Sequence, residues 1–220
     1  MQQPAELHKL FYTPVWRYEY PYFGEDFDDL AEYFTHDDMY LSEREQNGLQ
    51  ITKADLHKDL KLERLKSWIQ DCCESTMIQM GLKPDCGFTS MWATRQRAGG
   101  FHDMHIHANS FLGGVMHLFD SDNCASGTLF ENTDHPKYVI RPAELEGKSK
   151  MLEYSEHLPF IPGTVLIFPA WASHRTIPTE SRYRVILGFN SMPVGMTNAD
   201  HFDRYNYPDP LGLQLKEYQG

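Results

Sequence analysis

Residues 162–190 read PGTVLIFPAWASHRTIPTESRYRVILGFN, two apolar segments on either side of a polar loop. The first segment, Val165 to Phe168, follows a Pro-Gly turn and is typical of a buried strand, and the loop after it carries His174. An inward arginine in an apolar strand is costly unless it meets an anion, so Arg184 in the second segment is a candidate anion-binding residue. An exposed or internally paired Arg184 is the alternative. Because successive side chains of a strand point to opposite faces, one face of that segment carries Arg182, Arg184, Ile186, Gly188 and Asn190.

The rest of the chain adds further strands and a helical N-terminal part. Residues 8–20 predict an early strand, 25–35 a short helix and 54–80 a long amphipathic helix that ends at Gly81 and Pro84. After Pro84, β-branched and aromatic runs alternate with turn residues. They predict short strands near 87–97, 101–107, 112–119, 127–131, 137–141, 150–154, 164–168 and 182–190.

These elements predict a mainly β fold with supporting helices, a double-stranded β-helix (a cupin-like jelly roll) preceded by a helical N-terminal segment. With 220 residues and no repeat or linker, the chain is expected to form a single domain over residues 1–220. Its parts are a helical brace at about 25–82, a jelly-roll core at about 86–190 and a C-terminal extension at 191–220. The extension is interpreted as a lid, a homodimer contact or a loose tail.

A histidine cluster, HDMHIH, occupies residues 102–107. On a strand, Asp103, His105 and His107 would point to one face and His102 to the other. His105 and His107 would stand about 6 to 7 Å apart at the backbone, so both imidazoles could reach one ion at about 2.1 Å. Surface histidines or polar core residues are the alternative for an H-x-H pair taken alone. The distal His174 makes a metal site the favoured interpretation.

Together these segments resemble the Fe(II)- and 2-oxoglutarate-dependent oxygenases, which carry H-x-D/E, a distal histidine and a following Arg or Lys. They are more similar still to a group of small oxygenases of this kind from marine bacteria and phages. That group has the motifs H-x-H-x-N-S, F-P-x-W-x-x-H and R-x-x-x-x-F-N. The counterparts here are HIHANS at 105–110, FPAWASH at 168–174 and RVILGFN at 184–190, and the similarity runs from about residue 10 to 190.

The resemblance implies Fe(II) ligands at His105, His107 and His174, and it implies that Arg184 holds the far carboxylate of 2-oxoglutarate. Asp103 is an alternative third ligand to His107, and water or an anion in that position is a further one. Weaker candidates for cofactor contacts are Asn109, Ser110 and Asn190.

Two positions depart from the pattern. His107 stands where the wider superfamily has Asp or Glu, so three neutral imidazoles would leave the charge of the metal uncompensated unless the 2-oxoglutarate dianion restores the balance. In GGVMHL (113–118), Met116 or His117 replaces a tyrosine of the related sequences.

The implied activity is that of an Fe(II)- and 2-oxoglutarate-dependent dioxygenase. It would hydroxylate a small-molecule or peptidyl substrate with release of succinate and CO2, and ascorbate is expected to support activity in vitro. Two alternatives stay open. One is a cupin-type three-histidine metal dioxygenase or isomerase that does not use 2-oxoglutarate. The other is a non-catalytic metal- or ligand-binding jelly-roll module.

The composition of the chain indicates which classes of partner and which locations are unfavourable. A formal net charge of −11 argues against nucleic acid, which is bound through clustered Lys and Arg. No run of 18 apolar residues suggests a membrane span, and the first residues do not resemble a secretion signal. A cytoplasmic location is expected, because the four cysteines lack metal-ligand spacing and suit a reducing compartment. These are Cys72, Cys73, Cys86 and Cys124.

Overall fold

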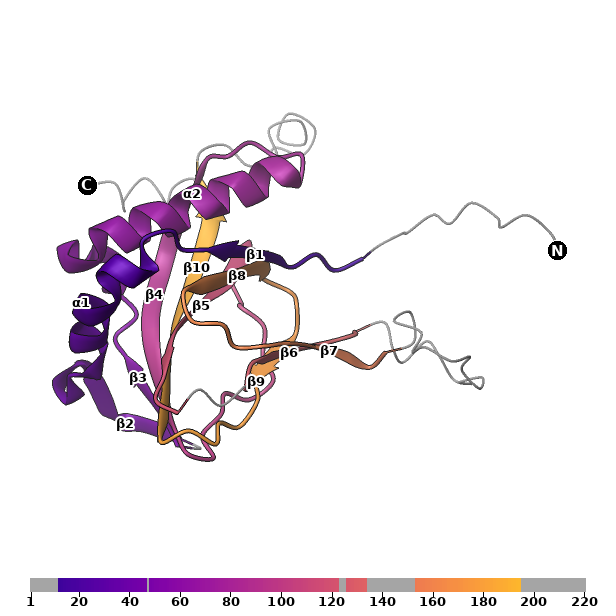
Figure 1. Cartoon of the computed structure of the whole chain (residues 1–220). Coiled ribbons are helices and arrows are strands. Elements are labelled where there is room, and N and C mark those ends of the chain that lie inside the picture. The colour runs from indigo at the N-terminus through magenta and orange to yellow at the C-terminus, as the bar shows by residue number, and fades with distance from the viewer. Residues whose placement is uncertain (1–11, 47, 123–125, 134–152, 195–220) are drawn as a thin grey trace.

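A computed structural model describes residues 12–46, 48–122, 126–133 and 153–194 (Figure 1). Its strands form a seven-stranded sheet of order β1-β8-β5-β10-β4-β3-β2 and a three-stranded sheet of order β7-β6-β9, with antiparallel pairing throughout. The strands are β1 Trp16–Glu19, β2 Tyr40–Gln46, β3 Leu49–Thr52, β4 Cys86–Arg97, β5 Leu112–Asp120, β6 Thr128–Glu131, β7 Ser155–Leu158, β8 Thr164–Pro169, β9 His174–Thr176 and β10 Tyr183–Pro193. The helices are α1 Phe23–Thr35 and α2 Glu63–Gln79, with 3₁₀ turns η1 Asp37–Met39, η2 Leu56–Lys58 and η3 Leu60–Leu62.

The large sheet is covered on both faces. In Figure 1, α1 and α2 lie on one side of it, and β6, β7 and β9 lie on the other. The helix side is a continuous apolar core, because alternate residues of β4 and β10 meet the buried face of α2. This core includes Leu65, Ile69, Met77, Met91, Ala93, Val185, Leu187 and Phe189.

The opposite, inner face of the large sheet turns toward the small sheet. A second apolar cluster fills the space between the sheets, and it consists of Val115, Phe130, Phe160, Leu166, Phe168, Ala172 and Ile186. Since successive residues of β10 alternate between the faces, Arg184 and Ile186 lie on the inner side and Val185 on the helix side. This arrangement confirms a mainly β fold with supporting helices.

Most predicted elements are present. The strands expected near 87–97, 112–119, 127–131, 164–168 and 182–190 correspond to β4, β5, β6, β8 and β10. The short helix at 25–35 lies within α1, and the early strand corresponds to β1.

The long helix predicted at 54–80 is wrong in its first third, because α2 begins only at Glu63. The preceding residues form the turns η2 and η3. Asp59 interrupts the helix, since its carboxylate accepts a hydrogen bond from the Lys61 backbone N–H at 2.8 Å and starts a new turn. Leu56 is buried while Leu60 is 81% exposed, so the apparent apolar period did not describe one helical face.

Residues 101–107 do not form the predicted strand. Their only strand-like pairing is an isolated bridge between His105 and His174. His105 N–H donates to His174 O and His107 N–H donates to Ala170 O, both at 2.9 Å. Only one residue lies between His105 and His107, whereas three residues lie between Ala170 and His174 on the opposite segment. The two segments therefore cannot form a regular β-ladder.

Other differences are smaller. The β2–β3 pair and β9 were not predicted, and His174 was expected in a loop rather than at the start of a strand. Residues 153 and 154 precede the strand β7 instead of ending one. The strand predicted at 137–141 and the C-terminal extension beyond residue 194 lie outside the described residues.

Within the described part of the chain, no helix has the length and apolar character needed to cross a membrane. Three of the four cysteines, Cys72, Cys73 and Cys86, are free and buried. Cys124 lies outside the described residues.

Candidate metal centre

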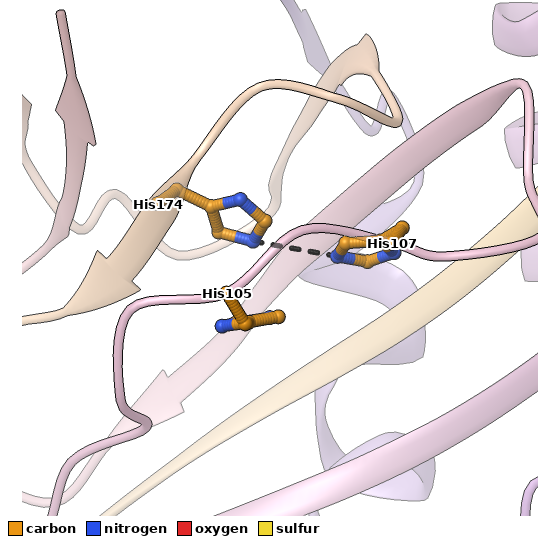
Figure 2. A group of neighbouring side chains, drawn as sticks. All are labelled: His105, His107 and His174. Atoms are coloured by element: carbon orange, nitrogen blue, oxygen red, sulfur yellow. Dashed lines mark hydrogen bonds between the residues drawn. The ribbon is translucent and has the colours of Figure 1, made fainter. Parts of the chain in front are cut away.

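Three histidines meet at one edge of the space between the sheets. His174 opens β9, and backbone hydrogen bonds with residue 105 in both directions, at 2.9 and 3.0 Å, align it with His105. His107 follows two residues later and is tied to Ala170 at the end of β8. Each of the three offers one ring nitrogen, and these atoms all lie within 4.8 Å of one another. Figure 2 shows His107 and His174 facing each other, with His105 beside them.

The other ring nitrogen of each histidine has an oxygen partner. Nδ1 of His105 lies 2.7 Å from Asp103 O, and Nδ1 of His174 lies 2.8 Å from Ala172 O. Nδ1 of His107 lies 2.5 Å from Oδ1 of Asn190. Carbonyl oxygens only accept hydrogen bonds, so each Nδ1 carries the proton and each Nε2 of a neutral ring is a bare lone pair.

With these tautomers, the contact between His107 and His174 is not an ordinary hydrogen bond. Nε2 of His107 and Nε2 of His174 are 3.3 Å apart (Figure 2). With both Nδ1 atoms protonated, neutral rings have no hydrogen to place between them, so two lone pairs face each other. Two nitrogens bound at about 2.1 Å to one metal with an angle near 90° would be about 3.0 Å apart. The spacing therefore suits a cation between the rings.

Burial favours the neutral form that a metal requires. It lowers the pKa of His107 to about 4 and that of His174 to about 3, and it also lowers the pKa of His105. Repulsion among the imidazolium forms lowers the pKa of His107 and His174 further. The cluster is thus a set of three uncharged imidazoles at neutral pH.

Asp103 lies apart from this group. Its side chain is exposed, and among the described residues the set of converging ligand atoms contains the three histidines without it. Its carboxylate acts on His105 at a distance by raising the pKa of that ring, against the larger effect of burial.

Among the predicted polar neighbours, only Asn190 contacts a histidine. Its Nδ2 donates to Ser90 Oγ at 3.0 Å, which orients Oδ1 toward His107. The Ser110 hydroxyl is directed to backbone oxygens, 2.7 Å from Leu112 O and 3.2 Å from Ser191 O. Asn109 is exposed and takes the left-handed conformation, with φ of 58°, in the turn before β5.

Two glycines make room for the cluster. A Cβ on Gly113 would lie 2.8 Å from Cγ of His107 and 2.9 Å from the Phe168 ring, so only glycine fits there. A Cβ on Gly188 would lie 2.7 Å from the Trp92 indole, whose ring centre is 5.8 Å from that of His107. A fourth histidine, His102, stacks on His105 with ring centres 4.0 Å apart. A prediction that placed residues 101–107 on a strand could not have found this stacking.

Arg184 lies farther along the same inner face of β10 and is 1% exposed. Its Nε donates to Gln96 Oε1 at 2.7 Å and one Nη2 hydrogen goes to the same oxygen. Nη2 also donates to Ile177 O at 2.8 Å, and Nη1 donates to Ser126 Oγ at 2.5 Å. Burial lowers the pKa of Arg184 to about 10, which leaves it charged at neutral pH.

The inner face of the large sheet carries further polar groups near Arg184, of which the sequence did not single out Thr94 and Gln96. Thr94 and Gln96 share the inner face of β4, and the Thr94 hydroxyl is buried without a hydrogen-bond partner among the described residues. His117 projects inward from β5 and stacks on Phe160, with ring centres 4.5 Å apart. Met116, by contrast, is part of the helix-side core. Of the two residues considered for the missing tyrosine, His117 is therefore the one on the inner side of the large sheet.

The arrangement of these elements is shared by known proteins. The structure of a Pseudomonas putida prolyl-4-hydroxylase matches with a TM-score of 0.58 at 12% identity, covering 82% of this chain and 93% of that one. The viral collagen prolyl hydroxylase of Paramecium Bursaria Chlorella virus-1, solved with 2-oxoglutarate, matches with a TM-score of 0.53 at 10% identity, covering 82% and 96%. HygX of Streptomyces hygroscopicus, with nickel and 2-oxoglutarate bound, gives 0.51 at 11% identity, covering 82% and 83%.

These similarities confirm the jelly-roll fold. No curated protein sequence matches the chain. The family model described as "Putative 2OG-Fe(II) oxygenase" matches residues 90–190, the stretch that contains all three histidines and Arg184. Over residues 90–190, a little under half of its length, the chain is therefore similar to the family of non-haem iron oxygenases that depend on Fe(II) and 2-oxoglutarate.

Proposed function

We propose that His105, His107 and His174 hold Fe(II) through their Nε2 atoms and that Arg184 binds the far carboxylate of 2-oxoglutarate. The observation that carries this assignment is the convergence of three histidines, each of which offers one ring nitrogen within 4.8 Å of the others and has its Nδ1 directed to an oxygen. Imidazole is a suitable ligand for Fe(II), and such hydrogen bonds on the far ring nitrogen orient metal-bound histidines in general.

The buried charge of Arg184 and the unpartnered hydroxyl of Thr94 are the reasons for proposing that a carboxylate ligand binds between the histidine cluster and the guanidinium. A buried cation favours an anion strongly, and a buried hydroxyl without a partner favours a ligand that can accept its hydrogen. Together these groups favour 2-oxoglutarate over the three-histidine alternative without this cosubstrate, since that alternative gives Arg184 no anion to bind.

When bound, Fe(II) would activate O2, with 2-oxoglutarate as the co-reductant: one oxygen atom would hydroxylate a C–H bond of the substrate, and the other would enter succinate as CO2 is released. The chain's own groups position these components. Arg184 orients the dicarboxylate by a charge-assisted hydrogen bond, Asn190 fixes the plane of the His107 ring, and Phe130 and Phe168 exclude water from the cluster. The ion and the Arg184 guanidinium together carry three positive charges, of which the two negative charges of 2-oxoglutarate would compensate two.

The substrate of this reaction is proposed to be a small molecule or a peptidyl residue. The net charge of −11 disfavours nucleic acid. The described prolyl hydroxylases act on prolyl residues, as their names state, and at 10 to 12% identity they extend that class to this chain only as a candidate. We further propose one domain over residues 1–220 and a cytoplasmic location, which suits the free buried thiols.

The test is a succinate-release assay with Fe(II), 2-oxoglutarate and ascorbate over a panel of amino acids and prolyl peptides. Uncoupled turnover of 2-oxoglutarate without substrate is the minimum expected result. Arg184→Leu should abolish it, because the hydrophobic residue fills the space without a charge. Full turnover by Arg184→Leu, or by protein stripped of metal, would contradict the proposed function.

A further inference from the structure

Arg184 is a buried cation whose hydrogen bonds, within the described residues, are all with neutral groups. Within the described residues no carboxylate lies within 4.0 Å of its guanidinium. Its acceptors are the Gln96 side-chain carbonyl, the Ser126 hydroxyl and the Ile177 backbone carbonyl. Burial of an unpaired charge costs several kcal/mol in proteins as a rule. Within the described part of the chain, Arg184 therefore has hydrogen-bond acceptors but no counter-charge.

The nearest acidic influence is Asp120, which lies opposite Arg184 in the β5–β10 register. Its charge raises the pKa of Arg184, against the larger lowering by burial, but the two side chains do not form an ion pair. Asp120 Oδ1 instead accepts from the Ser181 hydroxyl and the Asp122 backbone N–H, and Oδ2 has no partner among the described residues.

Gln96 is the main acceptor for the guanidinium, and its own orientation is fixed. It is fully buried and lies opposite Arg184 in the β4–β10 register. Its Nε2 donates to Thr176 Oγ1 at 2.9 Å, so its Oε1 must face Arg184, where it accepts from both Nε and Nη2. The planar guanidinium of an arginine commonly pairs with a carboxylate through two parallel hydrogen bonds. Here the side-chain amide of Gln96 takes the place of that carboxylate.

We propose that Gln96 is a positioning residue that holds Arg184 in place with an uncharged acceptor, so that the charge of the guanidinium remains available to the dicarboxylate cosubstrate. This inference rests on the proposed function of Arg184. A glutamate has the same shape and could still accept from Arg184, and its second oxygen could accept the Thr176 hydroxyl hydrogen. It would fit the site and would neutralise the cation.

The proposal therefore predicts opposite effects of one substitution on stability and on binding. Gln96→Glu should raise the Tm of the metal-free protein by about 2 to 4 °C, because it pairs a buried charge. It should weaken 2-oxoglutarate binding to the Ni(II)-loaded protein, measured by calorimetry, by about tenfold or more, because the cosubstrate then competes with a built-in carboxylate. A purely structural role for Gln96 would not separate the two quantities.

A matched control is available on the other face of the sheet. Gln50 in β3 is also buried, and its Oε1 accepts from Arg95 Nε at 3.0 Å. Arg95 already pairs with Asp37 at 2.5 Å, so Gln50→Glu repeats the chemical change where the arginine is satisfied. Its 2-oxoglutarate affinity should equal that of the wild type.

If Gln96→Glu does not fold, Ser126→Asp offers a carboxylate to Nη1 from the opposite side and should weaken 2-oxoglutarate binding in the same way. Wild-type affinity in a folded Gln96→Glu variant, or a lower Tm, would overturn the inference. Failure of the wild-type protein to bind 2-oxoglutarate would instead overturn the proposed function, while a raised Tm of Gln96→Glu would still support the unpaired cation.

Discussion

The side-chain amide of Asn190 joins His107 to the strand that carries Arg184. Oδ1 of Asn190 accepts from Nδ1 of His107, and Asn190 and Arg184 share the inner face of β10. The opposite strand partner, Ser90, holds the amide in the required orientation at 3.0 Å. One strand therefore fixes both a proposed metal ligand and the proposed carboxylate-binding residue, so that the distance between the two sites is set by the sheet itself.

Asn190→Ala should weaken metal binding by about 10- to 100-fold, because the ring of His107 loses the acceptor that fixes its tautomer and orientation. The measurement is Fe(II) or Ni(II) affinity by competition with a chelator. Asn190→Asp keeps an acceptor at the same place and should retain near wild-type affinity. Equal losses in the two variants would show that the hydrogen bond is not the cause.

Gly113→Ala should also lower metal affinity, because its Cβ would fall 2.8 Å from Cγ of His107 and displace the ring. Two other glycines provide controls. Gly24 has no atom within 4 Å of its added Cβ, so Gly24→Ala should leave both stability and metal affinity close to wild type. Gly114→Ala would strike the Phe189 ring in the helix-side core, and it should lower the Tm without a selective loss of metal binding.

Thr94→Val should weaken 2-oxoglutarate binding several-fold while leaving the ligand-free protein as stable as the wild type or about 1 kcal/mol more stable. Valine has the same shape and removes a buried hydroxyl that has no partner. Thr76→Val is the contrast, because its hydroxyl bonds Tyr18 OH at 2.9 Å on the helix side. Thr76→Val should lower the Tm and spare 2-oxoglutarate affinity, and the reverse pattern would contradict a contact between Thr94 and 2-oxoglutarate.

The stability of the metal-free protein should fall as the pH falls from about 6.5 toward 4. Burial lowers the pKa of His107 to about 4 and of His174 to about 3, whereas both titrate near 6.5 in the unfolded chain. In that window the unfolded state binds more protons, so protonation favours unfolding. Thermal unfolding at about pH 7.5 and about pH 5 measures the effect. His107→Gln should reduce the dependence of the Tm on pH. An equal Tm of the metal-free wild type at the two pH values would contradict the prediction.

The sequence predicted the parts of this protein that depend on short-range pattern. Alternation placed Arg184 and Asn190 on the inner face of one strand, and the apolar run after the Pro-Gly turn marked β8. It could not place residues that act through tertiary contacts. Gln96 and Thr94 look like ordinary polar residues of a strand, and only the β4–β10 register shows that they face Arg184 and its pocket.

Backbone irregularity accounts for the errors. The H-x-H pair was predicted to stand side by side on a strand, but it lies on a segment held by hydrogen bonds of uneven spacing to residues 170–174. The prediction that the long helix begins near residue 54 was wrong for a similar reason, because the carboxylate of Asp59 accepts a hydrogen bond that forms a separate turn. Both are local hydrogen-bond choices that the apolar pattern does not encode.

The proposed ligands His107 and His174 are 67 residues apart in sequence, and among the described residues this stretch includes β5, β6, β7 and β8. An ion held by both would join two distant parts of the folded chain, and because the site exists only in the folded state, its binding free energy would add to the free energy of unfolding. Occupancy by the ion would then govern how long the folded protein persists as well as its chemistry.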